Sequence, residues 1–476
     1  MGHLARTGLE ILNHRGEAAH GIAYIDNNTG AFELRTRLGL VRDTDIFHRM
    51  INSDFLIGHT RYGTSGPEDI ANAQPFKFVS RDMIEFALSH NGNITNDEEI
   101  RQLMRGNGAA TLAYRSATTD SVVIGQLLEK VVRRGSLQPR SIADALSPLI
   151  GSYSLAILVG GTDPAILAIR DKEGRMPLSV GENTRGFFVA SESVAFEPDF
   201  LNAPNNREVK PGELVIVRKS GFESYQLFDS DGMAKQICTF QWVYMAREDT
   251  TIAGANVANV RGRLGEVIAR NYRPQVDYVV PILDSGLPGA VEYSNASGVP
   301  LRIGIKKNRY MSSRTFQAAS QQEREVGVEN KHSVLSTMVE GRRVLVIDDS
   351  LVRGTTTSKL VSKLRAKGAK EVHLAFTFPA IISACVFGID FYNDQLLARR
   401  FMDMPEEERN RDMAEKIRAD SVYFVKVPDL VETISREGKG ITRDDLCVSC
   451  LTGVYRPSEI RVVEEGVRRG GVRRFD

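Results

Sequence analysis

Hydrophobic and polar positions follow one pattern up to about residue 230 and another after it. In the first part, short apolar runs are separated by turn-forming residues, and we predict strands at residues 21–25, 84–88, 153–159, 187–190 and 213–217. Helical patterns flank these strands at residues 4–13 and 121–132. The first part is therefore predicted to form sheets that are covered by helices.

From about residue 257 the pattern changes to helices that alternate with strands. We predict a helix at residues 356–367 and strands at residues 278–282, 301–305, 344–347 and 370–376. This alternation is typical of a parallel sheet. The hydrophilic run at residues 405–414 is expected to be an exposed helix or loop. We therefore predict two domains, residues 1–230 and residues 231–476.

The strand at residues 344–347 leads into a loop with the chemistry of a sugar-phosphate site. The loop begins with Asp348, Asp349 and Ser350 and continues with Arg353, Gly354, Thr355, Thr356 and Thr357. Backbone N–H groups of such a loop and of the following helix can bind one phosphate. The two carboxylates can accept hydrogen bonds from vicinal hydroxyls, directly or through a magnesium ion. Ligands of open α/β sheets bind at this end of the strands.

The loop sequence resembles the phosphoribosyl-pyrophosphate (PRPP) signature of type I phosphoribosyltransferases. Two further segments fit around PRPP: the turn Asp284, Ser285 and Gly286, and the basic run at residues 306–316, which we predict to be a lid. Displacement at C1 of PRPP places positive charge on the ribose and negative charge on the leaving pyrophosphate. The cations that could stabilise the pyrophosphate are Lys307, Arg309 and Arg314.

Composition narrows the possible partners. The chain of 476 residues has 61 basic and 60 acidic residues and a formal net charge of +1, so no overall field attracts nucleic acid or an anionic membrane. No stretch approaches the roughly 20 apolar residues that a membrane span needs. We expect a soluble, cytoplasmic protein that binds neither nucleic acid nor membrane.

Four cysteines, Cys238, Cys385, Cys447 and Cys450, form one C-x-x-C pair and two distant members. This distribution suits a four-thiolate metal site in the C-terminal part of the chain, and disulfides are not expected in the cytoplasm. Zinc and an iron–sulfur cluster both agree with four thiolates, and the spacing does not choose between them.

Motifs along the whole chain resemble one family. HRG at residues 14–16, GHTRYGTSG at 58–66, AQPF at 73–76 and SHNGNITN at 89–96 resemble an N-terminal-nucleophile glutamine amidotransferase domain. With KNRY, RTF, the PRPP loop, CVFGID at 385–390 and CVSCLTG at 447–453, the chain resembles the glutamine PRPP amidotransferases. The resemblance implies an αββα glutaminase-like domain followed by an α/β phosphoribosyltransferase domain with a parallel sheet.

The resemblance also implies a reaction and its site residues. Ammonia, from glutamine or free in solution, would attack C1 of PRPP and give 5-phosphoribosylamine, the first intermediate unique to purine synthesis. Arg61 and Asp120 would hold glutamine, and Asn91 with Gly92 would form the oxyanion hole. Lys307 and Lys331 would contact the phosphates of PRPP.

Cofactors, inhibitors and assembly follow from the same resemblance. Ser285, Asp348 and Asp349 would bind Mg²⁺, and the four cysteines would hold a 4Fe–4S cluster. Purine nucleotides would inhibit, and the enzyme would be a homodimer or homotetramer.

The nucleophile of this family is an amino-terminal cysteine. This chain begins Met1–Gly2–His3 and has no cysteine before Cys238, so we expect the chain as written not to hydrolyse glutamine. Either a cysteine lies upstream of a misassigned or truncated start, or the protein is a paralogue that uses free ammonia. Retention of the glutamine-pocket residues favours the first explanation.

Two other functions are compatible with the sequence. A non-catalytic paralogue would sense PRPP or nucleotides without turnover, whereas the lid and the DSG turn favour turnover. A glutaminase that supplies another transferase is the weakest alternative, because the nucleophile is missing.

Overall fold

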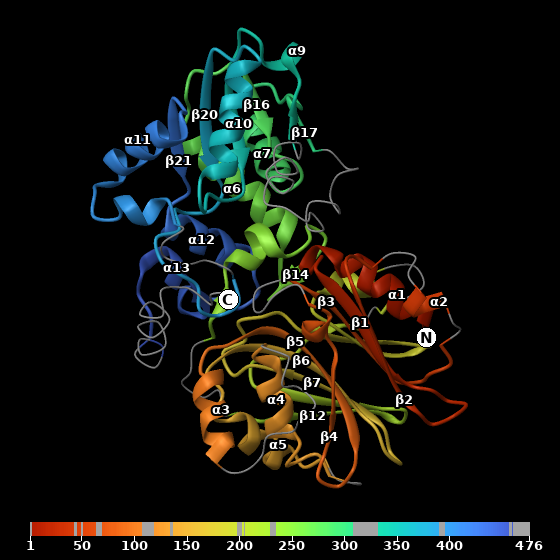
Figure 1. Ribbon diagram of the computed structural model, residues 1–476. Coiled ribbons are helices and arrows are strands. Elements are labelled where there is room, and N and C mark those ends of the chain that lie inside the picture. Colours follow the sequence, from red (N-terminus) through yellow and green to blue (C-terminus); the bar gives the residue numbers. More distant parts are fainter. Residues whose placement is uncertain are drawn as a thin grey trace. The chain divides into compact units, whose positions relative to one another are not determined.

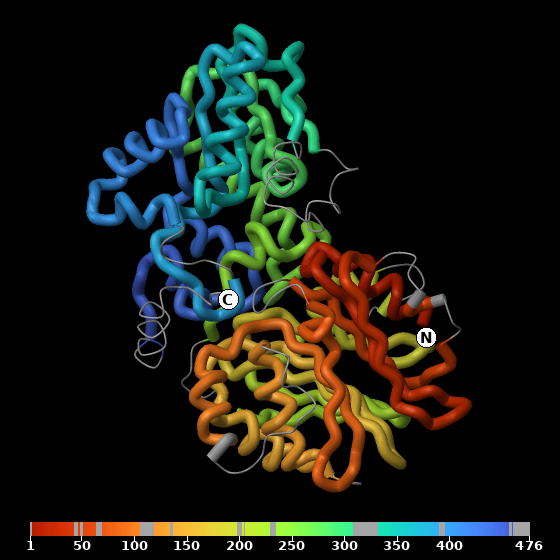
Figure 2. The backbone as a smooth tube through the Cα atoms, viewed as in Figure 1, coloured from red at the N-terminus to blue at the C-terminus, as the bar shows by residue number. Residues whose placement is uncertain are grey.

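The computed structural model describes residues 2–41, 45–48, 51–62, 69–106, 119–133, 137–197, 202–203, 205–228, 235–307, 332–389, 396–456 and 459. These residues form two compact units (Figures 1 and 2). The first unit contains the described chain up to Cys238 and also residues 386–389, and the second contains the other described residues. Compactness alone does not define an independently folding domain, so the limits 1–230 and 231–476 stay a prediction.

The described residues of the first unit form three antiparallel sheets and five α-helices. The largest sheet has the order β12-β11-β7-β6-β5-β4 and consists of β4 (Phe76–Val79), β5 (Glu85–Ile94), β6 (Gly151–Val159), β7 (Ala165–Arg170), β11 (Glu213–Arg218) and β12 (Gly221–Gln226). The sheet β2-β1-β3 consists of β1 (Ala19–Ile25), β2 (Phe32–Leu38) and β3 (Leu56–Arg61). The sheet β10-β8-β9 consists of β8 (Ser179–Asn183), β9 (Gly186–Ala190) and β10 (Arg207–Glu208). The helices are α1 (Gly2–Ile11), α2 (Asp45–His48), α3 (Asp97–Gly106), α4 (Ser121–Leu128) and α5 (Pro139–Leu146).

Alternating side chains of β5 place this strand between two cores. Phe86 and Leu88 belong to the core that contains α4 and α5, whereas Ala87 belongs to the core that contains Ile57 of β3. On the far side of the β2-β1-β3 sheet, Leu9 of α1 packs with Ile22 of β1. The layers therefore run helix, sheet, sheet, helix, which confirms the αββα prediction (Figure 1).

A four-stranded parallel sheet organises the second unit. Its order is β16-β19-β20-β21, with β16 (Tyr278–Pro281), β19 (Arg343–Asp348), β20 (Glu371–Phe376) and β21 (Ser421–Phe424). The other strands are β14 (Thr251–Ile252), β15 (Ala255–Asn256), β17 (Ile305–Lys307), β18 (His332–Val334) and β22 (Leu446–Cys447). The α-helices are α6 (Val257–Asn271), α7 (Leu287–Ser297), α9 (Ser336–Val339), α10 (Thr355–Ala366), α11 (Glu406–Ile417), α12 (Val427–Glu437) and α13 (Ser449–Thr452). This confirms the prediction of an α/β domain with a parallel sheet.

Helices cover both faces of the parallel sheet. Leu360 of α10 and Met413 of α11 join Val346 and Leu374 in one core. On the other face α7 contacts β16 and β19 and packs closely on α6. A Cβ atom on Gly265 of α6 would lie 2.0 Å from the carbonyl oxygen of Gly289, so this approach requires a glycine.

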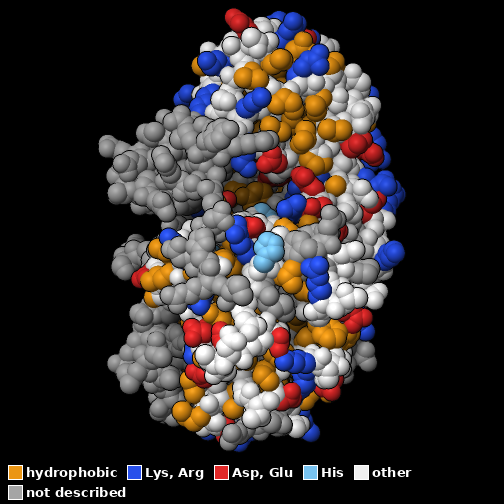
Figure 3. All heavy atoms as spheres, turned by 90° about the vertical axis from the view of Figure 1, so that its right-hand side faces the viewer, with side chains coloured by type: hydrophobic (Ala, Val, Ile, Leu, Met, Phe, Trp, Pro, Cys, Tyr) orange, Lys and Arg blue, Asp and Glu red, His pale blue; other side chains and the backbone are white. Residues whose placement is uncertain are grey.

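Two sequence-based predictions need correction. The strand predicted at residues 84–88 runs on through the SHNGN segment to Ile94, because β6 pairs with all of it. The predicted strand at residues 301–305 is wrong: Leu301 makes only an isolated bridge with Val279, and Ile305 begins the short hairpin strand β17. Within the described residues no helix is long and apolar enough to cross a membrane. Basic and acidic side chains are interspersed on the face shown in Figure 3, in keeping with the net charge of +1.

Candidate active site

The loop after β19 lies at the topological switch point of the parallel sheet. Val279 of β16 pairs with Leu345 of β19 on one edge and with Leu301 on the other. After β16 the chain therefore first passes Leu301 on one side of β16. It then crosses to the other side of β16, where it forms β19. Open α/β sheets bind ligands beyond the carboxyl ends of the strands at such a point.

Two neighbouring carboxylates at this point have different surroundings. Asp349 is buried, and its Oδ1 accepts a hydrogen bond of 2.6 Å from Ser350. Burial raises the pKa of the Asp349 carboxyl, and hydrogen bonds from Ser285 and Ser350 oppose this rise. Asp348 is partly exposed, and its Oδ1 accepts a hydrogen bond from the Asp349 N–H at 2.8 Å. Asp348 is therefore the more accessible carboxylate for a ligand.

The structure brings the predicted DSG turn against this acidic pair. The Ser285 side chain lies near enough to Asp349 to lower the pKa of its carboxyl, and a Cβ atom on Gly286 would lie only 2.3 Å from the carbonyl oxygen of Ile347 in β19. The backbone N–H of Ile282 also donates to that carbonyl, at 2.9 Å. A residue with a side chain at position 286 would push the turn away from β19.

The RGTTT segment forms the start of α10. Gly354 has a φ of +76°, a conformation that favours glycine, and a Cβ atom there would lie 2.7 Å from Cδ2 of Leu397. The helix begins at Thr355; Thr355 and Thr356 are exposed and Thr357 is buried. The N–H groups at a helix start and the helix dipole both favour an anion.

One predicted lid cation can be placed. Lys307 Nζ lies 3.3 Å from Asp284 Oδ2, and both side chains are exposed enough for solvent to screen the pair. The other three predicted phosphate ligands, Arg309, Arg314 and Lys331, lie outside the described residues.

A second site lies in the first unit, on β5. Asn91 has a buried Nδ2 atom with no hydrogen-bond partner among the described residues, which makes it a candidate donor to a ligand. Gly92 follows with a φ of +149°, and a Cβ atom there would lie 2.1 Å from the Ser152 carbonyl oxygen. An amide side chain next to a glycine in this conformation has the composition of an oxyanion hole.

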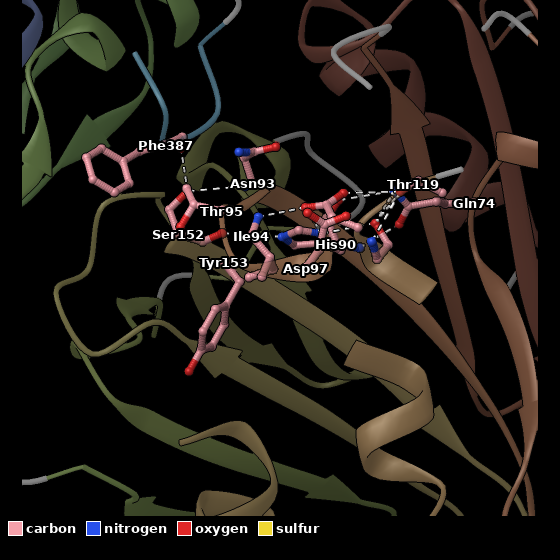
Figure 4. A network of polar contacts seen from close by, with 12 residues as sticks. Gln74, His90, Asn93, Ile94, Thr95, Asp97, Thr119, Ser152, Tyr153 and Phe387 are labelled. Atoms are coloured by element: carbon pink, nitrogen blue, oxygen red, sulfur yellow. Dashed lines mark hydrogen bonds and ion pairs between the residues drawn. The ribbon is translucent and has the colours of Figure 1, made fainter. Parts of the chain in front are cut away.

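Polar contacts surround this strand (Figure 4). Asp120 is buried and accepts a hydrogen bond of 2.7 Å from the N–H of Ile94. His90 Nδ1 lies 3.0 Å from Ser121 Oγ and 3.7 Å from Asp120 Oδ2. The His90 N–H donates to Gln74 at 2.7 Å. The pocket on β5 is therefore fixed by buried hydrogen bonds.

Arg61 is buried at the end of β3, the strand that faces β5. Its neighbour on the same side of the strand, His59, has Nε2 3.1 Å from the carbonyl oxygen of His90. Burial lowers the pKa of His59 to about 3, and the charges of His90 and Arg61 act in the same direction. His59 is therefore neutral at physiological pH, and Arg61 lies close to the pocket on β5.

Comparison with protein families gives both parts of the chain a description. A glutamine amidotransferase domain matches residues 60–198, and a phosphoribosyl transferase domain matches residues 252–383. The pocket on β5 lies in the first match and the switch-point site in the second.

Full-length relatives are similar over nearly the whole chain. Amidophosphoribosyltransferase of Methanocaldococcus jannaschii is 34% identical and covers 95% of this chain and 94% of its own length. That of Bacillus subtilis is also 34% identical, with 95% of this chain and 90% of the relative covered. The chain belongs to the amidophosphoribosyltransferase family. It is thus a phosphoribosyltransferase of the first step of purine biosynthesis.

Two solved structures are similar to this chain over nearly its whole length. The Bacillus subtilis glutamine PRPP amidotransferase, in complex with ADP and GMP, superposes with a TM-score of 0.81 at 32% identity, over 95% of this chain and 94% of that one. A structure described as the allosteric regulatory enzyme of purine biosynthesis gives a TM-score of 0.82 at 32% identity, over 95% and 93% of the two chains.

Three of the four cysteines affect the pKa of one partly buried phenol. Tyr455 donates a hydrogen bond of 2.6 Å to the Ala384 carbonyl, and its pKa is raised mainly by burial and further by Cys385, Cys450 and Cys447. Across the part of the chain that the structure describes, no group of three or more His, Cys, Asp or Glu side chains is arranged to hold a metal ion.

Sequence reasoning missed several residues around the pocket on β5. Gln74 and His90 stand inside motifs that carried the resemblance, AQPF and SHNGN, yet no role was predicted for them. Phe387 also stands inside a quoted motif, CVFGID, but its contact with Ser152 has no local sequence signal, because it joins residues 235 positions apart.

Proposed function

We propose that this enzyme joins ammonia, free or derived from glutamine, to C1 of PRPP. The nitrogen lone pair forms the new bond to C1. The bond from C1 to the pyrophosphate oxygen breaks, and its electron pair leaves with pyrophosphate. Loss of a proton from nitrogen gives 5-phosphoribosylamine. The observation that carries the proposal is the close approach of Gly286 to the Ile347 carbonyl, which places the DSG turn beside the acidic pair at the switch point.

PRPP would lie across this junction. The N-terminus of α10 and the threonine hydroxyls at its start would bind the 5′-phosphate. Asp348, the more accessible carboxylate, would accept hydrogen bonds from the ribose hydroxyls. Ser285 and Gly286 would hold the pyrophosphate from the other side. The cations that stabilise the leaving pyrophosphate would be Lys307, Arg309, Arg314 and Lys331.

The residues at this junction fit a magnesium ion. A partly exposed carboxylate at Asp348, the neighbouring carboxylate of Asp349 and the hydroxyl of Ser285 are the hard oxygen ligands that Mg²⁺ prefers. When bound, the ion would neutralise charge that develops on the leaving pyrophosphate.

The pocket on β5 would bind glutamine. The unpartnered Nδ2 of Asn91 supports a role as oxyanion-hole donor together with the N–H of Gly92. Arg61 and Asp120 would bind the charged groups of glutamine. None of the first 237 residues is a cysteine, so the nitrogen donor needs a direct test.

A 4Fe–4S cluster on Cys238, Cys385, Cys447 and Cys450 is part of the proposal. It rests on the family resemblance alone, because the described residues include no group of three or more His, Cys, Asp or Glu side chains placed to hold a metal ion. Purine nucleotides as inhibitors are supported by the complex of the Bacillus subtilis relative with ADP and GMP. A homodimer or homotetramer is expected from the family resemblance.

The test is release of pyrophosphate that depends on Mg²⁺ and PRPP, with glutamine or ammonium chloride as nitrogen donor. We expect release with ammonium by anaerobically purified protein. Release with glutamine would show that the chain has a nucleophile outside the assigned residues. Binding of PRPP without release under any condition would contradict the proposal and favour a PRPP sensor.

A further inference from the structure

The hairpin of β17 and β18 packs on the helix that begins at the proposed 5′-phosphate site. Ile305 at the base of the hairpin is fully buried and belongs to the same core as Leu360 of α10, and Val334 packs against that core. Figure 1 shows β17 beside α10, and β18 contacts this helix. All these elements belong to the second unit. The helix therefore supports the hairpin as well as the phosphate site at its start.

Lys307 stands at the end of β17. It pairs with His332 of β18 across the hairpin. Its Nζ lies 3.3 Å from Asp284 Oδ2 in the DSG turn, but both side chains are exposed, and solvent screens such a pair. The ion pair alone therefore holds Lys307 only weakly.

A second lysine, Lys363, holds the opposite strand. It lies in the last turn of α10 and is half-buried, and its Nζ donates a hydrogen bond of 3.1 Å to the His332 carbonyl. His332 is the residue directly opposite Lys307. A charged donor forms a stronger hydrogen bond than a neutral one, and water competes less with a bond that is partly buried. Lys363 therefore fixes the part of the hairpin from which Lys307 extends.

We propose that Lys363 is a positioning residue that holds Lys307 in place for the pyrophosphate of PRPP. This inference rests on the proposed function of the switch-point site. PRPP carries its 5′-phosphate and its pyrophosphate at opposite ends of the ribose. The start of α10 binds the first group, and the last turn of the same helix, through Lys363 and His332, positions the cation for the second. Lys363 therefore favours ligands that carry a pyrophosphate over ligands that carry the 5′-phosphate alone.

The first experiment measures binding of PRPP to the full chain by isothermal titration calorimetry with Mg²⁺ present. Lys363→Met keeps the aliphatic part of the side chain but removes the donor, and we expect the Kd for PRPP to rise about three- to tenfold, as for loss of one hydrogen bond. Lys363→Arg keeps a charged donor and should bind PRPP nearly as tightly as the wild type. The control is Lys367→Met, four residues further along, where the exposed lysine makes no side-chain hydrogen bond to any described residue. It removes the same charge and should leave the Kd unchanged.

The second experiment repeats the titration with ribose 5-phosphate, which has the 5′-phosphate and the ribose but no pyrophosphate. We expect Lys363→Met to bind this probe as the wild type does, because the contacts of the probe lie at the start of α10. Equal weakening of ribose 5-phosphate and PRPP would show damage to the helix itself and would overturn the positioning role. An unchanged Kd for PRPP in Lys363→Met would overturn it as well.

The double variant Lys307→Met/Lys363→Met tests whether Lys363 acts through Lys307. Lys307→Met removes the positioned cation, so we expect Lys363→Met to raise the Kd for PRPP by less than about twofold in that background. Two single effects that multiply in the double variant would overturn the inference, whereas pyrophosphate release by the wild type with ammonium would still support the proposed function. A wild-type chain that neither binds PRPP nor releases pyrophosphate would overturn both.

Discussion

Ser285 lies beside Asp349 and lowers the pKa of its carboxyl, so the turn after β16 approaches the loop after β19. The two residues follow neighbouring strands of the parallel sheet. Burial raises the pKa of the Asp349 carboxyl, and Ser285 opposes this rise. Ser285 therefore favours the charged form of Asp349 in the proposed PRPP site.

Replacing Ser285 by alanine should weaken PRPP binding. The variant removes a hydroxyl that favours the charged form of the buried Asp349, and we expect a loss of stability of about 1 kcal/mol and a several-fold higher KM for PRPP. Steady-state kinetics and chemical denaturation measure the two effects. Ser294→Ala, which removes a bond to the Val299 carbonyl within the same unit, should lower stability but leave the KM for PRPP unchanged. An equal KM effect in both variants would argue against a local role.

Gly354→Ala and Gly298→Ala form a matched pair. Both glycines have a φ of +76°, so both substitutions have the same conformational cost of about 1 kcal/mol. Only at Gly354 does the new methyl group meet another atom, Cδ2 of Leu397 at 2.7 Å. We expect PRPP binding to fall more than tenfold in Gly354→Ala and to remain normal in Gly298→Ala. Calorimetric titration with PRPP and Mg²⁺ checks this, and equal affinities would contradict the phosphate role of the loop.

Asn91→Ala should change glutamine binding without lowering the stability of the protein. Asn91 Nδ2 is buried and has no partner in the described part of the chain, so its removal should leave the free energy of unfolding unchanged or raise it by up to about 1 kcal/mol. Glutamine binding should weaken. Asn96 is the control, because its amide bonds both the Pro148 carbonyl and the Ile150 N–H at 2.9 Å. Asn96→Ala should cost about 1–2 kcal/mol in a denaturation experiment. Destabilisation of similar size in Asn91→Ala would show that Nδ2 has a partner in solution.

Acid should destabilise the first unit through His59. Its pKa is about 3 in the folded protein and 6.5 when unperturbed, so the unfolded state binds a proton first as the pH falls. The contribution of His59 is complete above pH 6.5 and decreases below it, by about 2 kcal/mol down to pH 5. His59→Gln, which keeps an amide donor for the His90 carbonyl, should reduce the loss of stability between these pH values. Denaturation curves of both proteins at several pH values test this, and parallel pH profiles would refute it.

Iron content tests the cysteine proposal. Anaerobically purified protein should contain about four iron atoms per chain and absorb visible light, and Cys450→Ser should lose both properties. The control is Ser449→Ala at the neighbouring position of α13, which should keep its iron. Zinc in place of iron would confirm a thiolate site but reject the cluster.

The sequence was most predictive where neighbouring residues determine the structure. The apolar run of β19, the acidic pair and the glycine at the start of α10 are adjacent in the chain, so strand, loop and helix could be predicted together. The change in the pattern of apolar and polar positions along the chain also indicated two halves of different architecture. The position of Arg309, Arg314 and Lys331 in the site stays a prediction.

Other features depend on distant partners. SHNGN reads as a turn, yet β6 holds it as a strand, with Gly92 adopting a conformation that other residues rarely adopt. Likewise, nothing in the sequence near Phe387 indicates a contact with Ser152. Such features follow from tertiary pairing, which local propensity does not encode.

The membership of residues 386–389 in the first unit limits how this enzyme can be divided. A cut after Cys238 would separate the amino-terminal piece from the acceptors of Asn93 and Ser152. A recombinant amino-terminal fragment would then retain unpaired buried donors, and the remaining fragment would carry a surplus segment. Chimaeras made by exchanging halves between homologues would combine residues 386–389 of one protein with Asn93 and Ser152 of another. Residues 386–389 therefore belong structurally with the amino-terminal half, despite their place in the carboxy-terminal half of the chain.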